Sequence, residues 1–414
     1  MADTGTLTNT SVNYVNSYTG EAEAFDTHNT MSPQMKTYYN TQALENTRPK
    51  RIFAQFGDRE PLPERHGTTV EWRKRNTFGD VGKLTEGVIP KGKKFGYSAI
   101  TADIYEYGDY VTLTDWLQMH AIDPVVLDAT EELTAAAMDT QDKLVRDELL
   151  TGTQVMFAPK SDATPVTSRS GIDNTCILTS KLVAKVATQF AADSVPNIDG
   201  HAVAVGIIHP FVAEDLRLND PNWVDYHKYD QPEEIFNGEV GMLHGVRFVV
   251  SPNAKIFKGE NLASDSATLT TSSSVSASKT IPFDGGTVVA DALIGRKVLI
   301  GTTVTTVTDN TDSQLTVEDN VTCDDNTTIY PGEGGAAGTA VFACEFLGKD
   351  AYKLIDAAGG NLQVITKNKG EIGGPLEQFS TVGVKYTAGC KIVYPERVIR
   401  VECGSSYGSV AVGN

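Results

Sequence analysis

The chain has 414 residues, 40% of them hydrophobic and 21% charged, which is ordinary for a folded protein and long enough for two or three domains. The net charge of −18 and the pI near 4.8 argue against a nucleic-acid-binding surface spread over the whole molecule, but they allow a local basic patch. Residues 1–30 are polar and acidic, unlike a secretory signal, and no apolar run reaches the roughly 18 residues that a membrane span needs.

The five cysteines are scattered along the chain and form no C-x-x-C pair. We therefore expect the cysteines to be reduced thiols of a protein that is made in a cytoplasm. We expect neither a disulfide framework nor a zinc site.

The N-terminal stretch is rich in Thr, Asn and Ser and poor in large apolar residues, which predicts an arm with little structure of its own. A short helix is predicted over 32–48, where Ser32-Pro33 resembles a helix start and apolar residues recur from Met35 to Leu44. We assign residues 1–45 to this arm and short helix.

The stretch over 46–110 predicts a long two-stranded hairpin that extends away from the rest of the chain. Thr69 to Arg75 alternates as a strand does, and the apolar residues between Ile100 and Leu113 indicate returning strands. The Gly-rich, charged stretch between them is too polar at its tip to have a core.

The charge of this hairpin differs from that of the rest of the chain. Residues 59–94 contain nine Lys or Arg and five Asp or Glu, so 9 − 5 gives +4 in a chain of −18. Either the hairpin is only solvated, or it reaches onto an acidic neighbouring copy of the chain, since opposite charges steer association. Charge alone leaves both interpretations open. The candidate inter-subunit contacts are Arg73, Arg75, Lys83, Lys91, Lys93 and Lys94.

The longest helix signal runs over 123–151. Asp123-Pro124 is typical of a helix start, apolar residues recur on one face from Val126 to Leu149, and Gly152 is a plausible stop. A helix of this length is a rod of about 42 Å, long for a compact domain and suited to a thin, extended protein.

The next part of the chain predicts a mixed α/β core after a loop over 153–170. The expected elements are a helix over 180–192, a strand over 201–209, a helix over 211–218 and a strand over 246–250.

Residues 259–345 read as an inserted all-β module. They begin with a flexible Ser/Thr-rich stretch over 264–280, continue with short β-branched runs separated by turns, and close with a Gly-rich linker over 332–338. Twelve acids and three bases over 260–345 give a charge of −9. Residues 346–403 then return to the mixed α/β pattern seen before the module, with strands over 382–386 and 398–401. The tail over 404–414 consists of small and polar residues.

Signatures of catalysis are scarce in this chain. The histidines show no metal-ligand spacing, and His209, which follows a buried strand, is expected to be a satisfied core histidine. The turns at Asp309-Asn310 and Asp324-Asn326 could hold calcium, but turn chemistry explains them without a metal. We expect no catalytic residue, no metal and no cofactor, and a structural assembly protein rather than an enzyme.

The order of parts resembles the major capsid proteins of tailed phages with the HK97-type fold, and more narrowly the N-four-like podovirus capsid family. Eight stretches carry the resemblance, which covers residues 31–258 and 346–403. They are residues 51–57 (RIFAQFG), 69–73 (TVEWR), 84–87 (LTEG), 108–115 (GDYVTLTD), 122–124 (IDP), 144–148 (LVRDE), 245–248 (GVRF) and 348–352 (GKDAY).

The resemblance implies an α+β HK97-type capsid fold with an inserted all-β domain. Its parts would be an N-terminal arm with a short helix (1–45), an extended β-hairpin loop lying across a neighbouring subunit (46–110), a peripheral domain with a spine helix over 123–151 (111–198), the first part of an axial domain (199–258), the insertion (259–345), and the remainder of the axial and peripheral domains with the C-terminal tail (346–414). It implies self-assembly into hexamers and pentamers of an icosahedral head around double-stranded DNA. Possible partners are decoration, portal and scaffolding proteins, with DNA in weak or indirect contact, and the host cytoplasm would be the place of assembly.

The alternative is a surface or adhesion protein, or a carbohydrate-acting protein, that binds ligand through the β-rich module. The three tryptophans, Trp72, Trp116 and Trp223, all lie outside that module, which counts against sugar stacking there.

Overall fold

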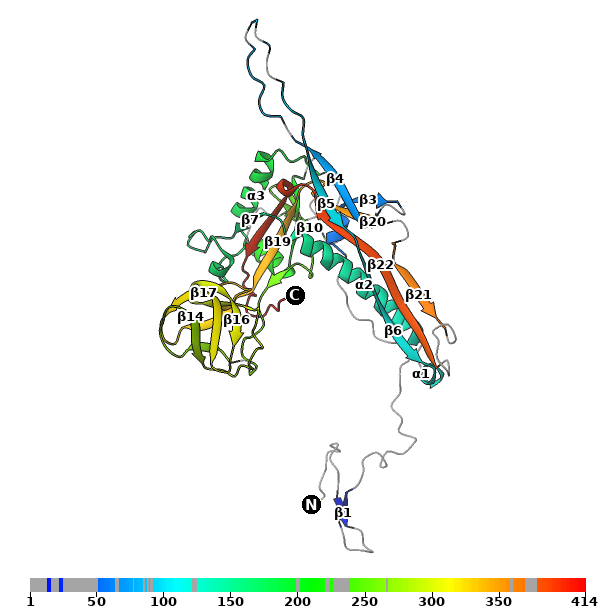
Figure 1. Ribbon diagram of the computed structural model, residues 1–414, viewed down its shortest axis with the longest axis vertical. Helices are drawn as coiled ribbons and strands as arrows, with labels where there is room; N and C mark the ends of the chain where they lie inside the picture. Colours follow the sequence, from blue (N-terminus) through cyan, green and yellow to red (C-terminus); the bar gives the residue numbers. More distant parts are fainter. Residues whose placement is uncertain are drawn as a thin grey trace.

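The computed structural model describes residues 13–15, 22–24, 51–63, 67–76, 78–84, 86–87, 89, 92–120, 125–198, 202–219, 224–225, 239–265, 267–357, 360–368 and 378–414 (Figure 1). Within the predicted arm, only the antiparallel pair β1 (Asn13–Val15) and β2 (Ala22–Ala24) belongs to these residues. The helix predicted over 32–48 and the helix start at Asp123-Pro124 lie outside them.

A sheet of eight strands forms the centre of the molecule. Its order is β7-β23-β19-β8-β11-β10-β9, and β12 pairs with β19. The strands are β7 (Gln154–Phe157), β8 (Ala204–Ile208), β9 (Val224–Asp225), β10 (Glu239–Leu243), β11 (Val246–Val250), β12 (Ile256–Phe257), β19 (Val341–Leu347) and β23 (Val398–Cys403). The pairs β7–β23 and β8–β11 are parallel and the others antiparallel, so the centre is a mixed sheet.

Apolar layers cover both faces of this sheet. Helices α3 (Ser180–Ala192) and α4 (Pro210–Asn219) pack on one face, and the large apolar residues of α3 fall at helical spacing and are buried: Leu182, Val183, Val186 and Phe190. The end of α2 (Val125–Leu149) and the short 3-10 helix η2 (Phe53–Gln55) pack on the other face. Gly206 allows close packing inside the sheet, because a Cβ there would lie 3.0 Å from the ring of Phe346.

The long helix α2 has 25 residues and continues from the central sheet along a second sheet. This second sheet has the order β21-β22-β20-β3, with β6 also paired to β22. Its strands are β3 (Asp58–Leu62), β6 (Tyr105–Thr114), β20 (Tyr352–Ala357), β21 (Gln363–Lys367) and β22 (Phe379–Ile392). Leu133 and Ala137 of α2 pack on Val382 and Val384 of β22, and the short helix α1 (Asp115–His120) follows β6 at the far end.

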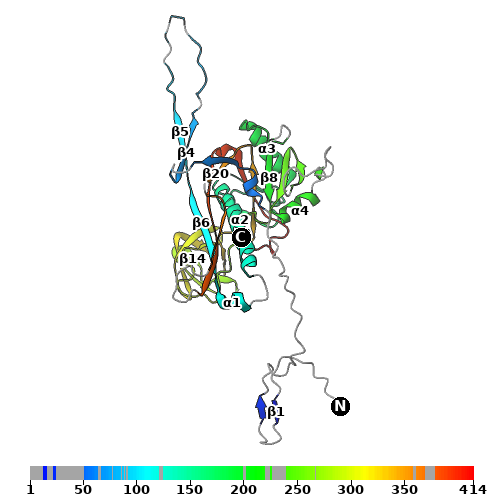
Figure 2. The same cartoon turned by 90° about the vertical axis from the view of Figure 1, so that its right-hand side faces the viewer.

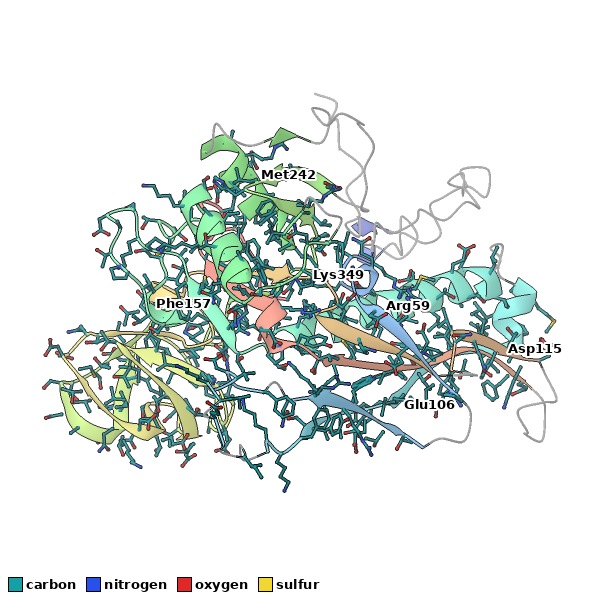
Figure 3. The ribbon with its side chains drawn as sticks, turned by 90° about the horizontal axis from the view of Figure 1, so that it is seen from above. Arg59, Glu106, Asp115, Phe157, Met242 and Lys349 are labelled. Atoms are coloured by element: carbon teal, nitrogen blue, oxygen red, sulfur yellow. The ribbon has the colours of Figure 1, made fainter. Side chains whose placement is uncertain are left out.

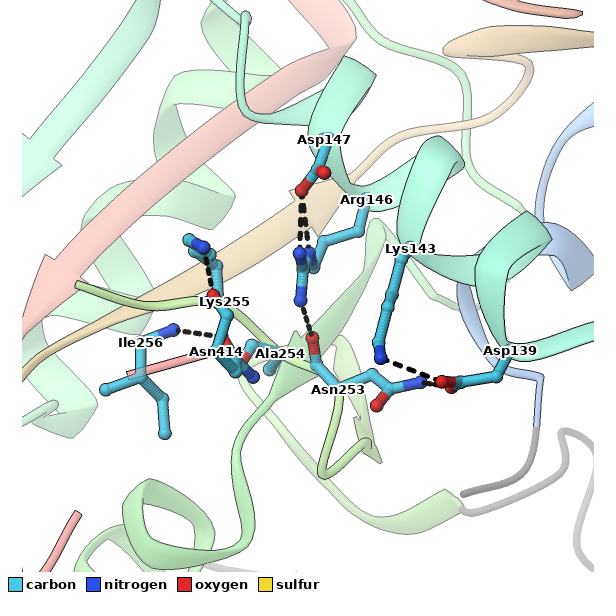
Figure 4. Close-up of polar contacts among 9 residues, drawn as sticks. All are labelled: Asp139, Lys143, Arg146, Asp147, Asn253, Ala254, Lys255, Ile256 and Asn414. Atoms are coloured by element: carbon cyan, nitrogen blue, oxygen red, sulfur yellow. Dashed lines mark hydrogen bonds and ion pairs between the residues drawn. The ribbon is translucent and has the colours of Figure 1, made fainter. Parts of the chain in front are cut away.

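Polar contacts fix α2 to the segments around it. Asp142 is buried and accepts hydrogen bonds from the backbone N–H groups of Ile52 and Ala54, at 3.0 and 3.3 Å. Arg146 donates to the carbonyl of Asn253, whose amide in turn donates to Asp139 (Figure 4). The helix is therefore held by side-chain contacts on two sides as well as by its apolar stripe.

Residues 269–331 form a closed barrel with its own apolar core. The order is β13-β14-β17-β16-β15-β18, from β13 (Leu269–Thr271), β14 (Val275–Asp284), β15 (Lys297–Ile300), β16 (Thr303–Asn310), β17 (Gln314–Cys323) and β18 (Thr328–Pro331). The chain leaves the central sheet after β12 and returns in β19, its pairing partner. Short 3-10 helices complete the fold: η3 (Arg169–Gly171), η5 (Ala336–Gly338) and η6 (Pro395–Arg397).

Two of the expected loops are strands. The loop predicted over 153–170 contains β7, because β7 pairs with β23, a partner more than 240 residues later that no local pattern reveals. The flexible stretch predicted over 264–280 contains β13 and the first part of β14. Most polar side chains of this part of β14 are exposed, Thr271 of β13 is buried and donates to the carbonyl of Asp324, and backbone pairing holds both strands.

The helix predicted over 123–151 ends at Leu149, two residues early, and a turn then leads to Gly152. The tail over 404–414, expected to be only small and polar, packs on the body: Ser405 and Ala411 are buried, and Ser405 donates to Asp215 at 2.6 Å.

The molecule is elongated and carries a hairpin that projects from one end (Figure 2). Seen from above, Asp115 lies at the far end of the second sheet and the barrel lies at the opposite side (Figure 3). Three parts therefore extend from the central sheet: the hairpin, the α2 sheet with its helix, and the barrel.

Candidate functional site

The projecting hairpin consists of β4 (Thr69–Arg75) and β5 (Tyr97–Asp103), paired antiparallel from Thr69–Asp103 to Arg75–Tyr97. Beyond Arg75 and Tyr97 the described residues of the tip form no further strand pair. Two strands without a third strand or a covering helix cannot build a core. The hairpin is thus positioned by the body but is not stabilised by a core of its own.

Five of the six predicted contact residues lie on this hairpin, and Lys91 lies outside the described residues. Arg73, Arg75, Lys83, Lys93 and Lys94 are all exposed. Arg73 lies 3.4 Å from Glu71 on its own strand, and the ammonium of Lys93 donates to the carbonyls of Gly79 and Asp80 across the tip. The structure brings these charges together on one projection, and their contact with another subunit stays a prediction.

Apolar side chains at the same tip were not singled out in the sequence, where the stretch was described as Gly-rich, charged and too polar at its tip to have a core. Val81 is 92% exposed and Ile89 94% exposed, and Leu84 is also exposed. Phe78, Phe95 and Tyr97 form a chain of ring contacts with centroids 5.7 and 5.0 Å apart. Exposed apolar groups gathered in this way are typical of a contact surface. Their signal in the sequence is weak, because single apolar residues stand between glycines and charges.

A second exposed apolar group lies at the far end of α2 and was not predicted. Trp116, Leu117 and Met119 of α1 and Leu127 of α2 are exposed there, and Trp116 is 72% exposed. Residues 109–132 contain six Asp or Glu and no Lys or Arg. We call this group the α1 surface; it is apolar and acidic, whereas the hairpin tip is apolar and basic.

Polar contacts join the root of the hairpin to the body. Lys74 forms an ion pair with Glu396 at 2.8 Å, and the indole N–H of Trp72 donates to Glu60 at 2.7 Å. Lys353 also donates to Glu60, and this bond, assisted by Trp72 against the effect of burial, lowers the pKa of Glu60. Burial raises the pKa of Glu396, but the bond from Lys74 and nearby groups outweigh it, so the net direction is downward. Both carboxylates are therefore charged at neutral pH.

The buried titratable groups elsewhere do not form a catalytic arrangement. Burial lowers the pKa of His209 to about 4, and its Nδ1 accepts from the backbone N–H of Phe211 at 3.3 Å, so the ring is neutral and packed among aromatic rings. Within the described ranges, no three His, Cys, Asp or Glu residues gather as metal ligands would. At the turns proposed for calcium, Asn310 instead bonds the backbone of Leu293 and Val289, and Asn326 adopts a positive φ of 59°.

None of the helices in the described part of the chain is long and apolar enough to cross a membrane.

Comparison with known families finds one matching model, described as phage capsid protein, which matches residues 97–343, more than half of the chain. No curated protein sequence matches the chain.

Solved structures of phage capsids share the fold. The capsid of cyanophage Pam1 is similar with a TM-score of 0.56 at 14% identity, covering 91% of this chain and 99% of that one. The capsid of cyanophage P-SCSP1u gives 0.54 at 12% identity over 90% and 94%, and that of Ralstonia phage GP4 gives 0.52 at 14% identity over 90% and 96%. At such low identity these likenesses concern the fold, which here is a mixed α and β arrangement along nearly the whole chain.

Proposed function

The chain belongs to the phage capsid protein family and is a major capsid protein, and we propose that it forms the hexamers and pentamers of an icosahedral head around double-stranded DNA. The observation that carries this proposal is the family match over residues 97–343. The likeness in fold adds to it, because it extends over nearly the whole length of the solved capsid chains. A surface, adhesion or carbohydrate-acting protein that uses residues 259–345 is not favoured by that match.

We propose that the parts of the molecule correspond to those of the HK97-type fold. Residues 1–45 would be the N-terminal arm and 46–110 the extended loop. Residues 111–198, with α2 as spine helix, would be the peripheral domain. Residues 199–258 would be the first part of the axial domain, and 346–414 would supply the remainder of the axial and peripheral domains and the C-terminal tail. Residues 259–345, which include the barrel, would be an insertion on the outer surface. The long α2 beside its narrow sheet supports this assignment, since it suits a thin wall.

The hairpin is proposed to dock on the α1 surface of a neighbouring copy. Both surfaces expose large apolar side chains, one is basic, and the other has six acids without a base. They lie at different ends of the subunit, so such a contact is head-to-tail, and head-to-tail contacts close rings when the rotation between copies allows it. Opposite charges speed the encounter, while burial of Val81, Leu84 and Ile89 would supply affinity.

The subunit is proposed to act through contacts and not through catalysis. Its partners would be further copies of itself, with decoration, portal and scaffolding proteins as additional partners. A net charge of −18 favours only weak or indirect contact with the packaged DNA. Assembly is proposed to take place in the host cytoplasm, and the product to be the capsid of the virion.

Removal of the hairpin tip tests this proposal. Because Arg75 and Tyr97 are paired, residues 76–96 can be replaced by Asn-Gly, a turn that suits a two-residue hairpin loop. We expect the variant to fold, since the tip contributes no core, but to form no shells. Electron microscopy and sedimentation of the expressed chain would show soluble subunits instead of particles.

Two controls separate the causes of this loss. A Gly-Ser segment of the same length keeps the reach of the loop but not its side chains, and should also fail. Replacing the exposed barrel residues Val289 and Ile294 by Ser removes apolar surface elsewhere and should leave shells intact. Regular shells from the Asn-Gly variant would contradict the proposed role of the hairpin.

A further inference from the structure

The hairpin is joined to the body by only two short connections. One strand begins after Gly67, whose φ of +90° lies in the region that favours glycine. The other strand, β5, is separated from β6 by Ile104 alone, and the N–H of Ile104 donates to the carbonyl of Thr68 at 2.9 Å. Both connections lie side by side, so rotation about them would move the whole hairpin as a unit.

Two polar contacts cross from the hairpin to the body just beyond these connections. Trp72 donates to Glu60 of β3, where Lys353 of β20 also binds, and the ammonium of Lys353 lies 5.8 Å from the indole ring. Two residues further along β4, Lys74 pairs with Glu396 and lies 4.7 Å from the centroid of the Tyr394 ring. The charged members come from three separate elements of the body.

The body side of these contacts is held firmly. Tyr394 lies against Arg397, whose guanidinium is 4.0 Å from the ring and donates to the carbonyl of Lys349 at 2.7 Å. The N–H of Tyr394 bonds the carbonyl of Ala351, and the carbonyl of Arg397 accepts from Gly348. The turn that presents Glu396 is thus tied to the segments at the end of β19 and the start of β23.

The side chains in these contacts remain partly open to solvent. Those of Lys74 and Glu396 are 36% and 39% exposed, and those of Lys353 and Glu60 are 25% and 36% exposed. Ion pairs of this kind are weak compared with buried ones. Contacts of this strength favour one angle between the hairpin and the body but do not fix it.

The root of β5 also packs on the body, since Ala102 is buried and Ile104 lies against Gly389 of β22. We propose that Glu60 and Glu396 are positioning residues that hold the part of the hairpin beyond this root at one angle to the body, about a hinge at Gly67 and Ile104. The hairpin of an unassembled subunit then already points in the direction in which it docks. Release of either carboxylate broadens the range of angles. The link to docking rests on the proposed function, whereas the hinge and its two contacts belong to the single subunit.

The test uses the unassembled full-length chain. Spin labels attached through an unnatural amino acid at the exposed positions Ala99 of β5, within the paired part of the hairpin, and Lys185 of α3 report the distance from hairpin to body. The unchanged chain should give one narrow distance distribution, and E60Q with E396Q a broad one. Hydrogen exchange at the root of β4 should rise by about fivefold, the factor that an exposed ion pair can supply.

A charge swap makes the test specific to the pair. K74E and E396K alone should each broaden the distribution, and the double variant K74E/E396K should restore the narrow one. E71Q is the matched control, because Glu71 lies on the same strand but pairs only with Arg73 among the contacts described for it. Unchanged melting temperatures would show that all variants are folded.

Narrow, unchanged distances in E60Q/E396Q and in both single swap variants would overturn the proposal. That result would leave the capsid function untouched, because shell formation is scored separately. Conversely, a chain that forms no shells but shows the swap pattern would support the hinge while contradicting the docking of the hairpin.

Discussion

Glu345 lies in the middle of β19, is 1% exposed, and has no hydrogen-bond partner for either carboxylate oxygen. Burial raises its pKa to about 8, Arg400 on the neighbouring strand lowers it, and Glu402 raises it further. At neutral pH the carboxyl is therefore mostly protonated, because its neighbours in the sheet are largely apolar and disfavour the charged form. A residue of this kind makes the stability of the folded chain depend on pH in a known direction.

We expect stability to fall as pH rises through the range from about 4.5 to about 8 because of Glu345. In this range the unfolded chain has lost the proton and the folded chain still holds it, so raising the pH favours unfolding. The upper limit of the effect is on the order of 5 kcal/mol. Urea unfolding at several pH values, compared between the unchanged chain and E345Q, measures it.

E345Q should remove most of this dependence of stability on pH. Its free energy of unfolding should therefore increase relative to that of the unchanged chain as pH rises from 6.5 to 8.5. His209 does not interfere, because its lowered pKa reduces stability only as pH falls from about 6.5 towards 4. Identical slopes for the two chains above pH 6.5 would show that the Glu345 carboxyl is not protonated in the folded state.

At the scale of elements, the barrel closes on itself, because all its strands pair with one another. Its closed sheet leaves no edge to the solvent, and Leu315 and Val317 lie fully inside its core. The central sheet has a separate core that contains none of these residues. The two parts are thus able to lose stability separately.

Leu315→Ala should destabilise the barrel alone, by about 2–4 kcal/mol, because it leaves a cavity in a small core. Hydrogen exchange should accelerate over residues 269–331 and stay unchanged over 204–250. The matched control is Val304→Ala, a partly exposed position of the same barrel, which should have little effect. Equal acceleration in both regions would mean that barrel and central sheet unfold as one.

The elements that could be predicted from the sequence are those whose pattern is local. β4, α3 and β11 have the bounds that the sequence pattern indicates: β4 alternates, α3 has one apolar stripe, and β11 is a largely apolar run buried on both faces. β7 and β13 were missed, since each is held by backbone pairing with a distant strand. The basic residues of the hairpin were found by counting charges. The apolar α1 surface was missed, because Trp116 and Met119 resemble core residues in the sequence and only the fold shows that their side chains are exposed.

At the scale of the whole molecule, we expect the separation of charge to influence how copies meet. The hairpin is basic, while residues 109–132 and the barrel region are acidic, in a subunit of −18. Subunits of like net charge repel at long range, so a productive encounter depends on the local attraction between unlike patches. Salt weakens both effects, but the local attraction decides which orientation forms.

We therefore expect K83E/K93E/K94E to slow shell formation by at least about tenfold at low salt, where electrostatic steering is strongest. Light scattering after mixing measures the rate. K181E/K185E/K279E makes the same change in net charge on α3 and the barrel, and should slow assembly far less. Equal slowing by the two triple variants would show that net charge, and not the hairpin, controls the rate.

The pairing of β12 with β19 has a consequence for how this subunit can change over time. Ile256 lies opposite Phe342 and Phe257 opposite Val341, so the chain departs and returns at adjoining positions of one ladder. We therefore expect the segment between these two strands to tolerate lengthening, shortening or exchange while the pairing of β12 with β19 persists. In evolution or in design, another closed domain could then stand in place of the barrel without a change in the strand order of the central sheet.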